Sequence, residues 1–488
     1  MQRDVGLAIA VIAIIVVASI GAYFLLNPAN AIPTTASNSG STLNASSSLG
    51  TSSGSKATST STTSSTGSFS TVMGGSDWPT YHHDNSRTGN AGVLSVASAK
   101  AGWVSQHLDG KVYAEPLAFG GKIFVATEND SVYALNPQTG ATIWRTNLGI
   151  PVLGTSLPCG NINPSGITGT PVIDPATGTL YVVAFKVPAN HSLVALNASN
   201  GKVVFTRPAD PPGSDPTVQQ ERAAMSIANG MVYWPFGGLY GDCGDYHGWV
   251  VGSRLDGTGS EVAYMVPSGR EAGIWGPSGA VVDASGNIFV ATGNGASSTT
   301  FDHGNSVVEL SPSLQELGYF APSNWAQLNQ DDADLGTIGP SIMANGLIFQ
   351  TGKAGVGYLL NPANLGGIGG EVYSSSVCSS VYGGMATSGN TVFVPCTDGV
   401  VALNVSNSSF AVSWRGPSFT AGPPIVTGNV VWALDVSSGT LHGFDAKTGR
   451  ELFSFNTGGA TRFTTPMFAY GRLFVATDSG LLSFDLGT

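Results

Sequence analysis

Several stretches of this chain carry side chains that could do chemistry. The run SNWAQLNQDDADLG places Asp331, Asp332 and Asp334 close together, and a carboxylate held beside a hydroxyl can act as a general base. The strand end FVATGNG presents Asn294, whose carbonyl oxygen is a ligand that Ca²⁺ accepts. The loop QTGKAGVG presents Lys353, a cation that could stabilise developing negative charge.

Two further stretches have the same character. GIWGPSG presents Trp275, a broad aromatic face on which a planar ring can stack, and LYGDCGDYHGWVVG offers the carboxylates of Asp242 and Asp245. Each candidate also has a structural interpretation. Trp275 could be a packed core residue, and Asn, Asp and Lys in Gly-rich loops are commonly turn residues or solvated surface.

These candidates lie in a body, residues 77–488, that is built from repeats. A Gly-rich turn, an aliphatic residue and an aromatic residue recur at intervals of 39 to 60 residues, with the aromatic at Phe124, Tyr181, Tyr233, Phe289, Phe349, Phe393, Trp432 and Phe474. Most copies have one strand signal before the strand that carries this aromatic residue and two strand signals after it. Four antiparallel strands per unit predict an all-β fold, an eight-bladed β-propeller.

The last repeat suggests how the ring closes. The eighth unit ends after its third strand, while KAGWVSQHL at 100–108 has the character of a fourth strand. Its Trp103 stands where Trp144 and Trp414 stand in their own fourth strands. A strand donated from the amino side would remove the open sheet edge, so we expect 77–488 to form one closed domain.

The amino terminus predicts a membrane anchor. Residues 5–26 are uncharged and long enough to cross a bilayer as a helix, and Arg3 favours a cytoplasmic start. We therefore interpret 1–31 as an anchor and 32–76, which is Ser/Thr-rich, as a flexible linker. The alternative is a cleaved signal peptide ending at ANA. The expected location is the cell membrane, single-pass with an extracellular propeller, or secretion if cleavage occurs.

Composition limits the partners. The net charge is −11, charged residues make up 10% of the chain, and no basic cluster is present, which argues against nucleic acid. An external location also permits glycosylation, for which sequons stand at Asn44, Asn129, Asn190, Asn197, Asn404 and Asn407.

The four cysteines predict disulfides. An even number outside the cytoplasm favours pairing, and proximity in the blades favours Cys159 with Cys243 and Cys378 with Cys396. The alternative, a metal site, lacks a CxxC spacing.

The repeats resemble those of a known family. LNPQTGATIW and FDAKTGRELF resemble the repeats of pyrroloquinoline quinone (PQQ) proteins, and DWPTYHHDNSRTG resembles the segment that opens many of them. The resemblance covers about 410 residues. This eight-bladed superfamily includes quinoprotein alcohol dehydrogenases, polyvinyl alcohol dehydrogenase-like proteins, scaffold propellers such as BamB, and tetrathionate hydrolases. Fold likeness alone does not choose among these functions.

The resemblance implies a cofactor site. In quinoprotein dehydrogenases a strand end similar to FVATGNG supplies a Ca²⁺ ligand, which implies that role for Asn294. A Glu ligand of those enzymes would be replaced here by Asp242 or Asp245. Lys353 matches a cation that faces the quinone oxygens of PQQ, and Trp275 would support the cofactor ring by stacking.

The resemblance also implies a catalytic base, with departures. The family's Asp-Trp pattern appears here as Asn324-Trp325, so the base would be Asp334 or Asp332. The adjacent cysteine pair of the methanol-oxidising enzymes is absent from this sequence.

Three functions follow as hypotheses. The first is an oxidoreductase that uses PQQ and Ca²⁺ to oxidise an alcohol or sugar hydroxyl of a small-molecule substrate. Because the sequence has no CxxCH haem motif, its electrons would pass to a separate acceptor. The second is a non-catalytic scaffold of the BamB type that binds a surface protein. The third is a cofactor-free hydrolase of the tetrathionate type, with an aspartate near 331–334 as acid or base.

Overall fold

The computed structural model describes residues 77–92 and 95–488. The predicted anchor (1–31) and linker (32–76) lie outside these residues. Within the described part of the chain, no helix combines the length and apolar character needed to span a membrane.

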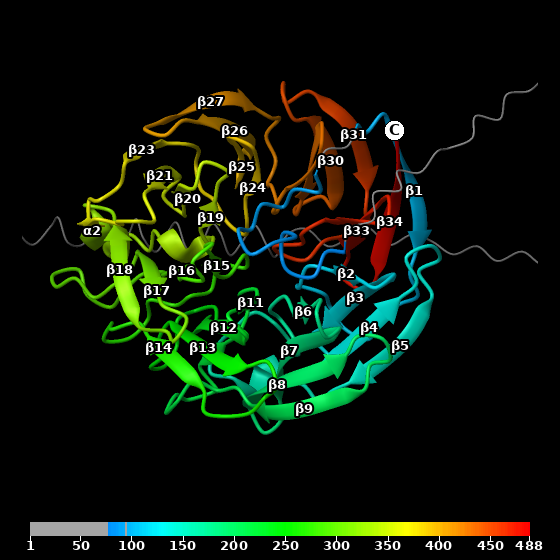
Figure 1. The fold of residues 1–488 in the computed structure, drawn as a ribbon, viewed down its shortest axis with the longest axis horizontal. Coiled ribbons are helices and arrows are strands. Elements are labelled where there is room, and N and C mark those ends of the chain that lie inside the picture. The colour runs from blue at the N-terminus through cyan, green and yellow to red at the C-terminus, as the bar shows by residue number, and fades with distance from the viewer. Residues whose placement is uncertain (1–76, 93–94) are drawn as a thin grey trace, which may run out of the picture. The chain divides into compact units, whose positions relative to one another are not determined.

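The described residues form eight antiparallel sheets arranged as blades around a central axis (Figure 1). The predicted eight-bladed, all-β propeller is therefore confirmed. The aromatic anchor of every repeat lies in the second strand of its blade, and each is at most 3% exposed. These inner strands are buried on both faces, and for this reason their sequences are unbroken runs of apolar residues.

The strands follow chain order around the ring. Blades one and two contain β2 (Leu117–Phe119), β3 (Lys122–Thr127), β4 (Ser131–Leu135), β5 (Thr142–Asn147), β6 (Val172–Asp174), β7 (Thr179–Lys186), β8 (Asn190–Asn197) and β9 (Val203–Pro208). Blades three and four contain β10 (Gln219–Gln220), β11 (Ser226–Ala228), β12 (Met231–Gly238), β13 (Trp249–Arg254), β14 (Val262–Met265), β15 (Val281–Val282), β16 (Ile288–Ala291), β17 (Val307–Leu310), β18 (Glu316–Ala321) and, parallel to β18, β22 (Gly367–Ile368).

Blades five and six contain β19 (Ser341–Ile342), β20 (Ile348–Gln350), β21 (Val356–Leu360), β23 (Tyr373–Ser376), β24 (Ala386–Ser388), β25 (Thr391–Cys396), β26 (Gly399–Val405) and β27 (Phe410–Arg415). Blades seven and eight contain β28 (Ile425–Thr427), β29 (Val430–Asp435), β30 (Thr440–Asp445), β31 (Glu451–Asn456), β32 (Met467–Ala469), β33 (Arg472–Ala476), β34 (Leu481–Gly487) and β1 (Ser98–Val104). Three short helices lie between blades: η1 (Gly154–Ser156), α2 (Trp325–Gln330) and η2 (Leu335–Thr337).

The fourth-strand tryptophans fasten one blade to the next. The ring of Trp103 lies so close to Gly140 of the following blade that a Cβ there would stand 2.4 Å from it. Gly140 also has φ +71°, a backbone conformation that glycine adopts readily. The Trp103 indole donates a hydrogen bond to Pro137 O at 2.9 Å. Trp144 and Trp414 repeat this contact in other blades, which explains the TG turns of the repeat.

The last blade is completed by the amino-terminal strand. β1 pairs antiparallel with β34, from Ser98 opposite Gly487 to Val104 opposite Leu482. The strand expected at 100–108 thus begins two residues earlier and ends at Val104. Its register shifts between Ala101 and Val104, where the regular pairing breaks.

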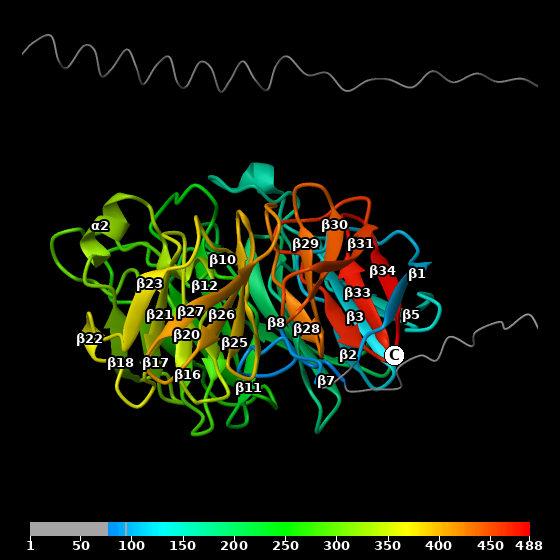
Figure 2. The ribbon, with the colours of Figure 1, turned by 90° about the horizontal axis from the view of Figure 1, so that it is seen from above.

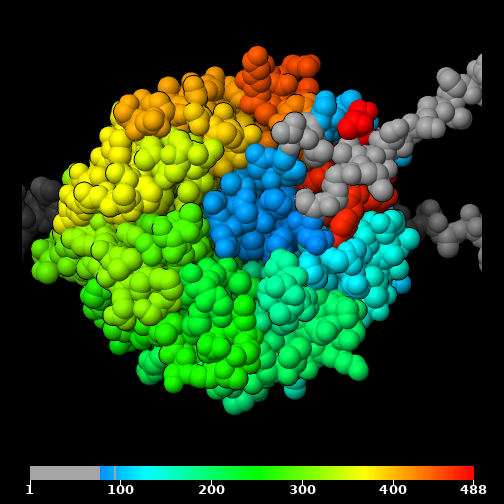
Figure 3. Space-filling view, in the orientation of Figure 1, coloured from blue at the N-terminus to red at the C-terminus, as the bar shows by residue number. Residues whose placement is uncertain are grey.

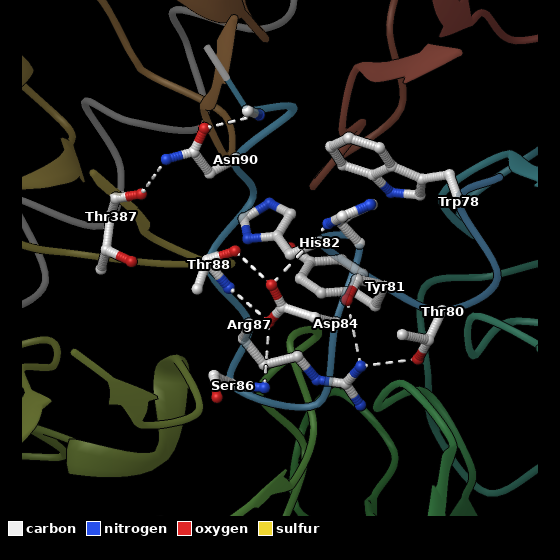
Figure 4. A network of polar contacts seen from close by, with 12 residues as sticks. Trp78, Thr80, Tyr81, His82, Asp84, Ser86, Arg87, Thr88, Asn90 and Thr387 are labelled. Atoms are coloured by element: carbon white, nitrogen blue, oxygen red, sulfur yellow. Dashed lines mark hydrogen bonds and ion pairs between the residues drawn. The ribbon is translucent and has the colours of Figure 1, made fainter. Parts of the chain in front are cut away.

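Residues 77–91 fill the centre of the ring on the face opposite α2 (Figures 2 and 3). Hydrogen bonds join this segment to every blade, at Ala118, Ile173, Met225, Val282, Ile342, Thr387, Val426 and Tyr470. Arg87 is buried at the axis and donates to Thr80 Oγ1 at 2.7 Å (Figure 4). It also donates to Met225 O at 3.0 Å. The segment is therefore a polar plug that holds the blades together at one end of the axis.

Candidate active site

The opposite end of the axis opens into a cavity of about 820 Å³, which we call the funnel. Its walls come from blades three to eight. Most of the candidate residues from the sequence line it, namely Asp242, Trp275, Asn294, Asp332, Asp334 and Lys353, whereas Asp331 and Asp245 are not among its lining residues. They meet there because the loops between the second and third strands, and the segments between blades, converge on one face of a propeller.

Asp334 is the most enclosed carboxylate of this group. It follows α2 and immediately precedes η2, and its side chain is 11% exposed, whereas that of Asp332 is 71% exposed. Its Oδ1 accepts a hydrogen bond from the backbone N–H of Asn294 at 2.7 Å. Burial raises the pKa of Asp334 to about 6, despite the opposing effects of this hydrogen bond and of Lys353.

Lys353 joins the two aspartates. Its Nζ lies 2.7 Å from Asp332 Oδ2 and 3.4 Å from Asp334 Oδ2. Partial burial works to lower the pKa of Lys353, but the two carboxylates outweigh it and raise the value. Lys353 is therefore a charged group that faces the funnel beside a buried carboxyl.

Asn294 is fixed by neighbours on both sides of its amide. Its Nδ2 donates to Asp332 Oδ1 at 2.8 Å, and its Oδ1 accepts from Asn305 Nδ2 at 3.0 Å. Asn305 is fully buried and accepts a hydrogen bond from Leu335 N at 2.6 Å. Asn305 also donates to Asn329 Oδ1 at 2.7 Å, which ties the strand end of blade four to α2.

Asp242 lines the funnel and bonds to a tyrosine. Its Oδ1 accepts a hydrogen bond from the Tyr246 hydroxyl at 2.6 Å, and the residue is exposed. A further carboxylate lines the funnel on a segment that pairs with the Asn294 loop: Glu271 forms a backbone bridge with Gly295, and the neighbouring Ala272 N–H donates to Asn294 O at 2.6 Å. Partial burial raises the pKa of Glu271 above its ordinary value; the Arg270 guanidinium, 2.9 Å from Glu271 Oε1, opposes this effect, and nearby acidic groups add to it.

Sequence reasoning missed Glu271 and also missed Arg222. The Arg222 guanidinium carbon lies 5.5 Å from the Trp275 ring centre and 5.6 Å from that of Phe463. The charged pair Arg270-Glu271, which ends two residues before GIWGPSG begins, was the available signal for Glu271. Arg222 lies in a different part of the sequence, and the spacing of the repeats does not predict its contact with Trp275.

Both predicted disulfides are confirmed, and each lies close to the funnel. Cys159 pairs with Cys243, beside the loop that carries Asp242, and Cys378 pairs with Cys396. The residues on either side of Cys396 line the cavity. The group Cys378, Cys396 and Asp398 has the spacing of a metal site, but its sulfurs are joined in the disulfide.

The donor set can be compared with what Ca²⁺ requires. Ca²⁺ takes oxygen ligands, and the funnel offers carboxylates of Asp334, Asp332 and Glu271 together with the Asn294 carbonyl. A bound cation would also offset the burial that raises the pKa of Asp334. The residues present therefore suit such an ion in type and in charge.

Comparisons with known proteins agree with this fold. A family model described as outer membrane protein assembly factor BamB matches residues 87–316 and 358–488. A polyvinylalcohol dehydrogenase of Sphingopyxis sp. (strain 113P3) is 23% identical over 414 residues, covering 73% of this chain. The match covers 58% of that relative, so this chain spans less than two thirds of its length.

Two solved structures share the architecture. Quinohemoprotein alcohol dehydrogenase from Comamonas testosteroni superposes with a TM-score of 0.64 at 17% identity, covering 84% of this chain and 80% of that one. BamB from Moraxella catarrhalis gives a TM-score of 0.51 at 14% identity, covering 80% and 98%. At these identities the likeness shows the fold, and the function has to be argued from the funnel.

Proposed function

Because this chain belongs to the PQQ-repeat family described as outer membrane protein assembly factor BamB, and carries a polar funnel, we propose that it is a quinoprotein-like alcohol oxidoreductase. One observation carries this proposal. Asp334 is a buried carboxyl with a pKa raised to about 6, and it lies against both Asn294 and Lys353 in one cavity. A carboxylate that titrates in this range is suited to accept a proton from an alcohol.

The residues of the funnel take separate roles in this proposal. Asn294 and Glu271 would hold Ca²⁺, Lys353 would face the quinone oxygens, and Trp275 would support the ring of PQQ. When bound, the cofactor would accept the two electrons that leave the alcohol as it becomes a carbonyl. A separate acceptor would then take those electrons onward.

The protein's own contribution is to orient the substrate and move a proton. The Asp334 carboxylate would accept the hydroxyl proton, and the ammonium of Lys353 would stabilise the negative charge that develops nearby. The backbone N–H of Asn294 fixes the Asp334 oxygen in place. Such orientation is what allows a general base to contribute to the rate.

The likeness to the polyvinylalcohol dehydrogenase supports an alcohol as the substrate class. The two disulfides support a location outside the cytoplasm, where thiols are oxidised. We propose an extracellular propeller attached to the cell membrane through residues 1–31.

A binding propeller without cofactor is the second candidate. The observation that favours it is that Asn294 Oδ1 already accepts from Asn305, and that Asp332 is already paired with Lys353. These groups are satisfied by the protein itself. A scaffold that binds a surface protein would need no ligand in the funnel.

Titration calorimetry of the full chain with PQQ, with and without Ca²⁺, separates the two candidates. The oxidoreductase proposal expects saturable binding that strengthens with Ca²⁺ and weakens at least tenfold in Asn294→Ala and in Lys353→Ala. Lys447→Ala, an exposed turn lysine outside the cavity, serves as the matched control. Absence of binding under both conditions would remove the oxidoreductase and leave the binding propeller.

A further inference from the structure

Arg222 and Arg462 form a cationic wall of the funnel, whose charge is opposite to that of the acidic group around Asp334. Arg222 lies between β10 and β11 of blade three, and Arg462 comes from the segment before blade eight. The guanidinium carbon of Arg222 lies 5.6 Å from the ring centre of Phe463, the residue that follows Arg462. The two arginines therefore line the same part of the funnel despite their distance in the sequence.

Both groups rest on aromatic rings, and the acidic group that Arg222 faces is Glu128, which makes no ion pair with it among the described residues. Arg222 lies between the rings of Trp275 and Phe463, and Arg462 lies 5.8 Å from the centre of the Tyr240 ring. Among the described residues, neither guanidinium makes a hydrogen bond or ion pair with an acceptor. Stacking holds a guanidinium in place while its N–H donors stay available in the plane of the group. Two such groups side by side in a cavity favour an anionic ligand.

The Trp275 indole connects this wall to the proposed base. A Cβ at Gly293 would stand 2.5 Å from Asp334 Oδ1 and 3.1 Å from Trp275 Nε1, so one edge of the indole lies beside Asp334. The same ring carries Arg222. A ligand whose anionic group contacts Arg222 can therefore place a second group near Asp334 if only a few bonds separate the two.

Phe463 is held in an unusual conformation next to this wall. Its φ is +65°, which is uncommon for a bulky residue. Thr465 Oγ1 donates to Phe463 O at 3.0 Å, and Thr461 Oγ1 donates to Val112 O at 2.6 Å, so hydrogen bonds fix both flanks of the segment. This anchoring keeps Arg462 and Phe463 directed at the funnel.

We propose that Arg222 and Arg462 bind the carboxylate of the ligand, and that the alcohol oxidised in the funnel is a small hydroxy acid. This inference rests on the proposed function for the oxidation step alone. The anion subsite itself depends only on the two arginines. In the reaction, the hydroxy acid would lose its hydroxyl proton to Asp334 and the hydrogen of its carbinol carbon, together with two electrons, to the quinone; the C–H and O–H bonds break, a C=O bond forms, and the product is an oxo acid.

The test is calorimetry of the full chain with glycerate and with its neutral counterpart glycerol. We expect glycerate to bind and glycerol to bind at least tenfold more weakly. Arg222→Gln and Arg462→Gln should each weaken glycerate binding by at least tenfold, because a charged hydrogen bond is lost. Arg450→Gln, an exposed arginine outside the funnel, should leave it unchanged. Because Arg462 is exposed, its variant still decides the question if the Arg222 variant does not fold.

Equal affinity of glycerate for the wild type and both funnel variants would overturn the inference, as would equal binding of glycerol. PQQ itself carries carboxylates and provides the second arm. If PQQ displaces glycerate and the same variants weaken both, the subsite belongs to the cofactor and the hydroxy-acid assignment is wrong. If glycerate binds while PQQ is present, the hydroxy-acid assignment is supported.

The two arms also keep this inference separable from the proposed function. PQQ binding without glycerate binding would overturn the anion subsite and leave the oxidoreductase intact. Glycerate binding without PQQ binding would support the subsite and overturn the oxidoreductase.

Discussion

Asp334 and Lys353 contact each other through both side chain and backbone. Lys353 Nζ lies 3.4 Å from Asp334 Oδ2, and the Lys353 N–H donates to Asp334 O at 2.8 Å. The cation therefore keeps a fixed position beside a carboxyl whose pKa burial raises to about 6. The balance of these two effects sets the pH range in which Asp334 can accept a proton.

The first prediction concerns the pH profile of turnover. A general base works when deprotonated, so kcat/KM should fall about tenfold per pH unit below the pKa of Asp334, which is about 6 without a bound cation and lower with one, and level off above it. Lys353→Met removes a charge that lowers the pKa of Asp334, and the acidic limb should move up by about one pH unit. Lys447→Met is the control. An unchanged limb in Lys353→Met would show that another group titrates.

The second prediction assigns the base. Asp334→Asn should reduce turnover by about 10²- to 10⁴-fold, because an amide cannot accept the hydroxyl proton, while cofactor affinity falls far less. Asp331→Asn is the matched control, since Asp331 is exposed and bonds only to Gln327 among the described residues. Steady-state kinetics measured beside calorimetry checks both quantities. Full turnover in Asp334→Asn would mean that the base is a different residue.

The fold was predictable because its main signal is repeated eight times. Strands buried on both faces leave apolar runs, and the TG turns that receive Trp103 and its counterparts recur with them. The meeting of Asn294 with Lys353 was predictable for a related reason, since equivalent loops of every blade reach the same face.

Other parts of the site had no such signal. Arg222 reaches Trp275 across a blade boundary, and repeat spacing carries no information on contacts of that kind. Glu271 stands near Asn294 because it pairs with Gly295 through a single backbone bridge. No sequence motif predicts a bridge of this kind. The exposed position of Asp242 follows from its hydrogen bond to Tyr246, which a loop sequence does not reveal.

The third prediction concerns stability in acid. Glu128 and Asp130 are buried in blade one, and burial is the main reason that their pKa values rise to about 7 and about 8. Asp130 faces Glu128, Lys186 and Asp109, and Glu128 faces Arg222. Both carboxyls bind protons more tightly in the folded chain than in the unfolded one.

The free energy of unfolding should therefore fall as the pH rises from about 4 through 8, by at least ~1 kcal/mol. Denaturant titrations at pH 5 and pH 8.5 measure this difference. Asp130→Asn should make the two values more nearly equal, whereas Asp256→Asn, at a fully exposed turn, should not. Greater stability at pH 8.5 than at pH 5 would contradict the assignment.

The fourth prediction concerns the axial plug. Arg87 donates hydrogen bonds to carbonyl oxygens of two blades, Met225 O and Ala280 O, and is 1% exposed. Arg87→Met leaves these acceptors buried without a donor, and we expect the free energy of unfolding to fall by about 3 kcal/mol or more. Urea unfolding beside the surface variant Arg450→Met measures this. Equal losses in the two variants would show that the plug does not hold the ring together.

The most direct test of the central claim is a single turnover followed by absorbance. The full chain, loaded with PQQ and Ca²⁺ without oxygen or acceptor, is mixed with glycerate, polyvinyl alcohol or a simple alcohol. We expect the spectrum of the oxidised quinone to change to that of the reduced form with at least one of these, and to change at least a hundredfold more slowly in Asp334→Asn. A chain that binds PQQ yet leaves its spectrum unchanged with every alcohol, or that reduces it equally fast in Asp334→Asn, would contradict the account.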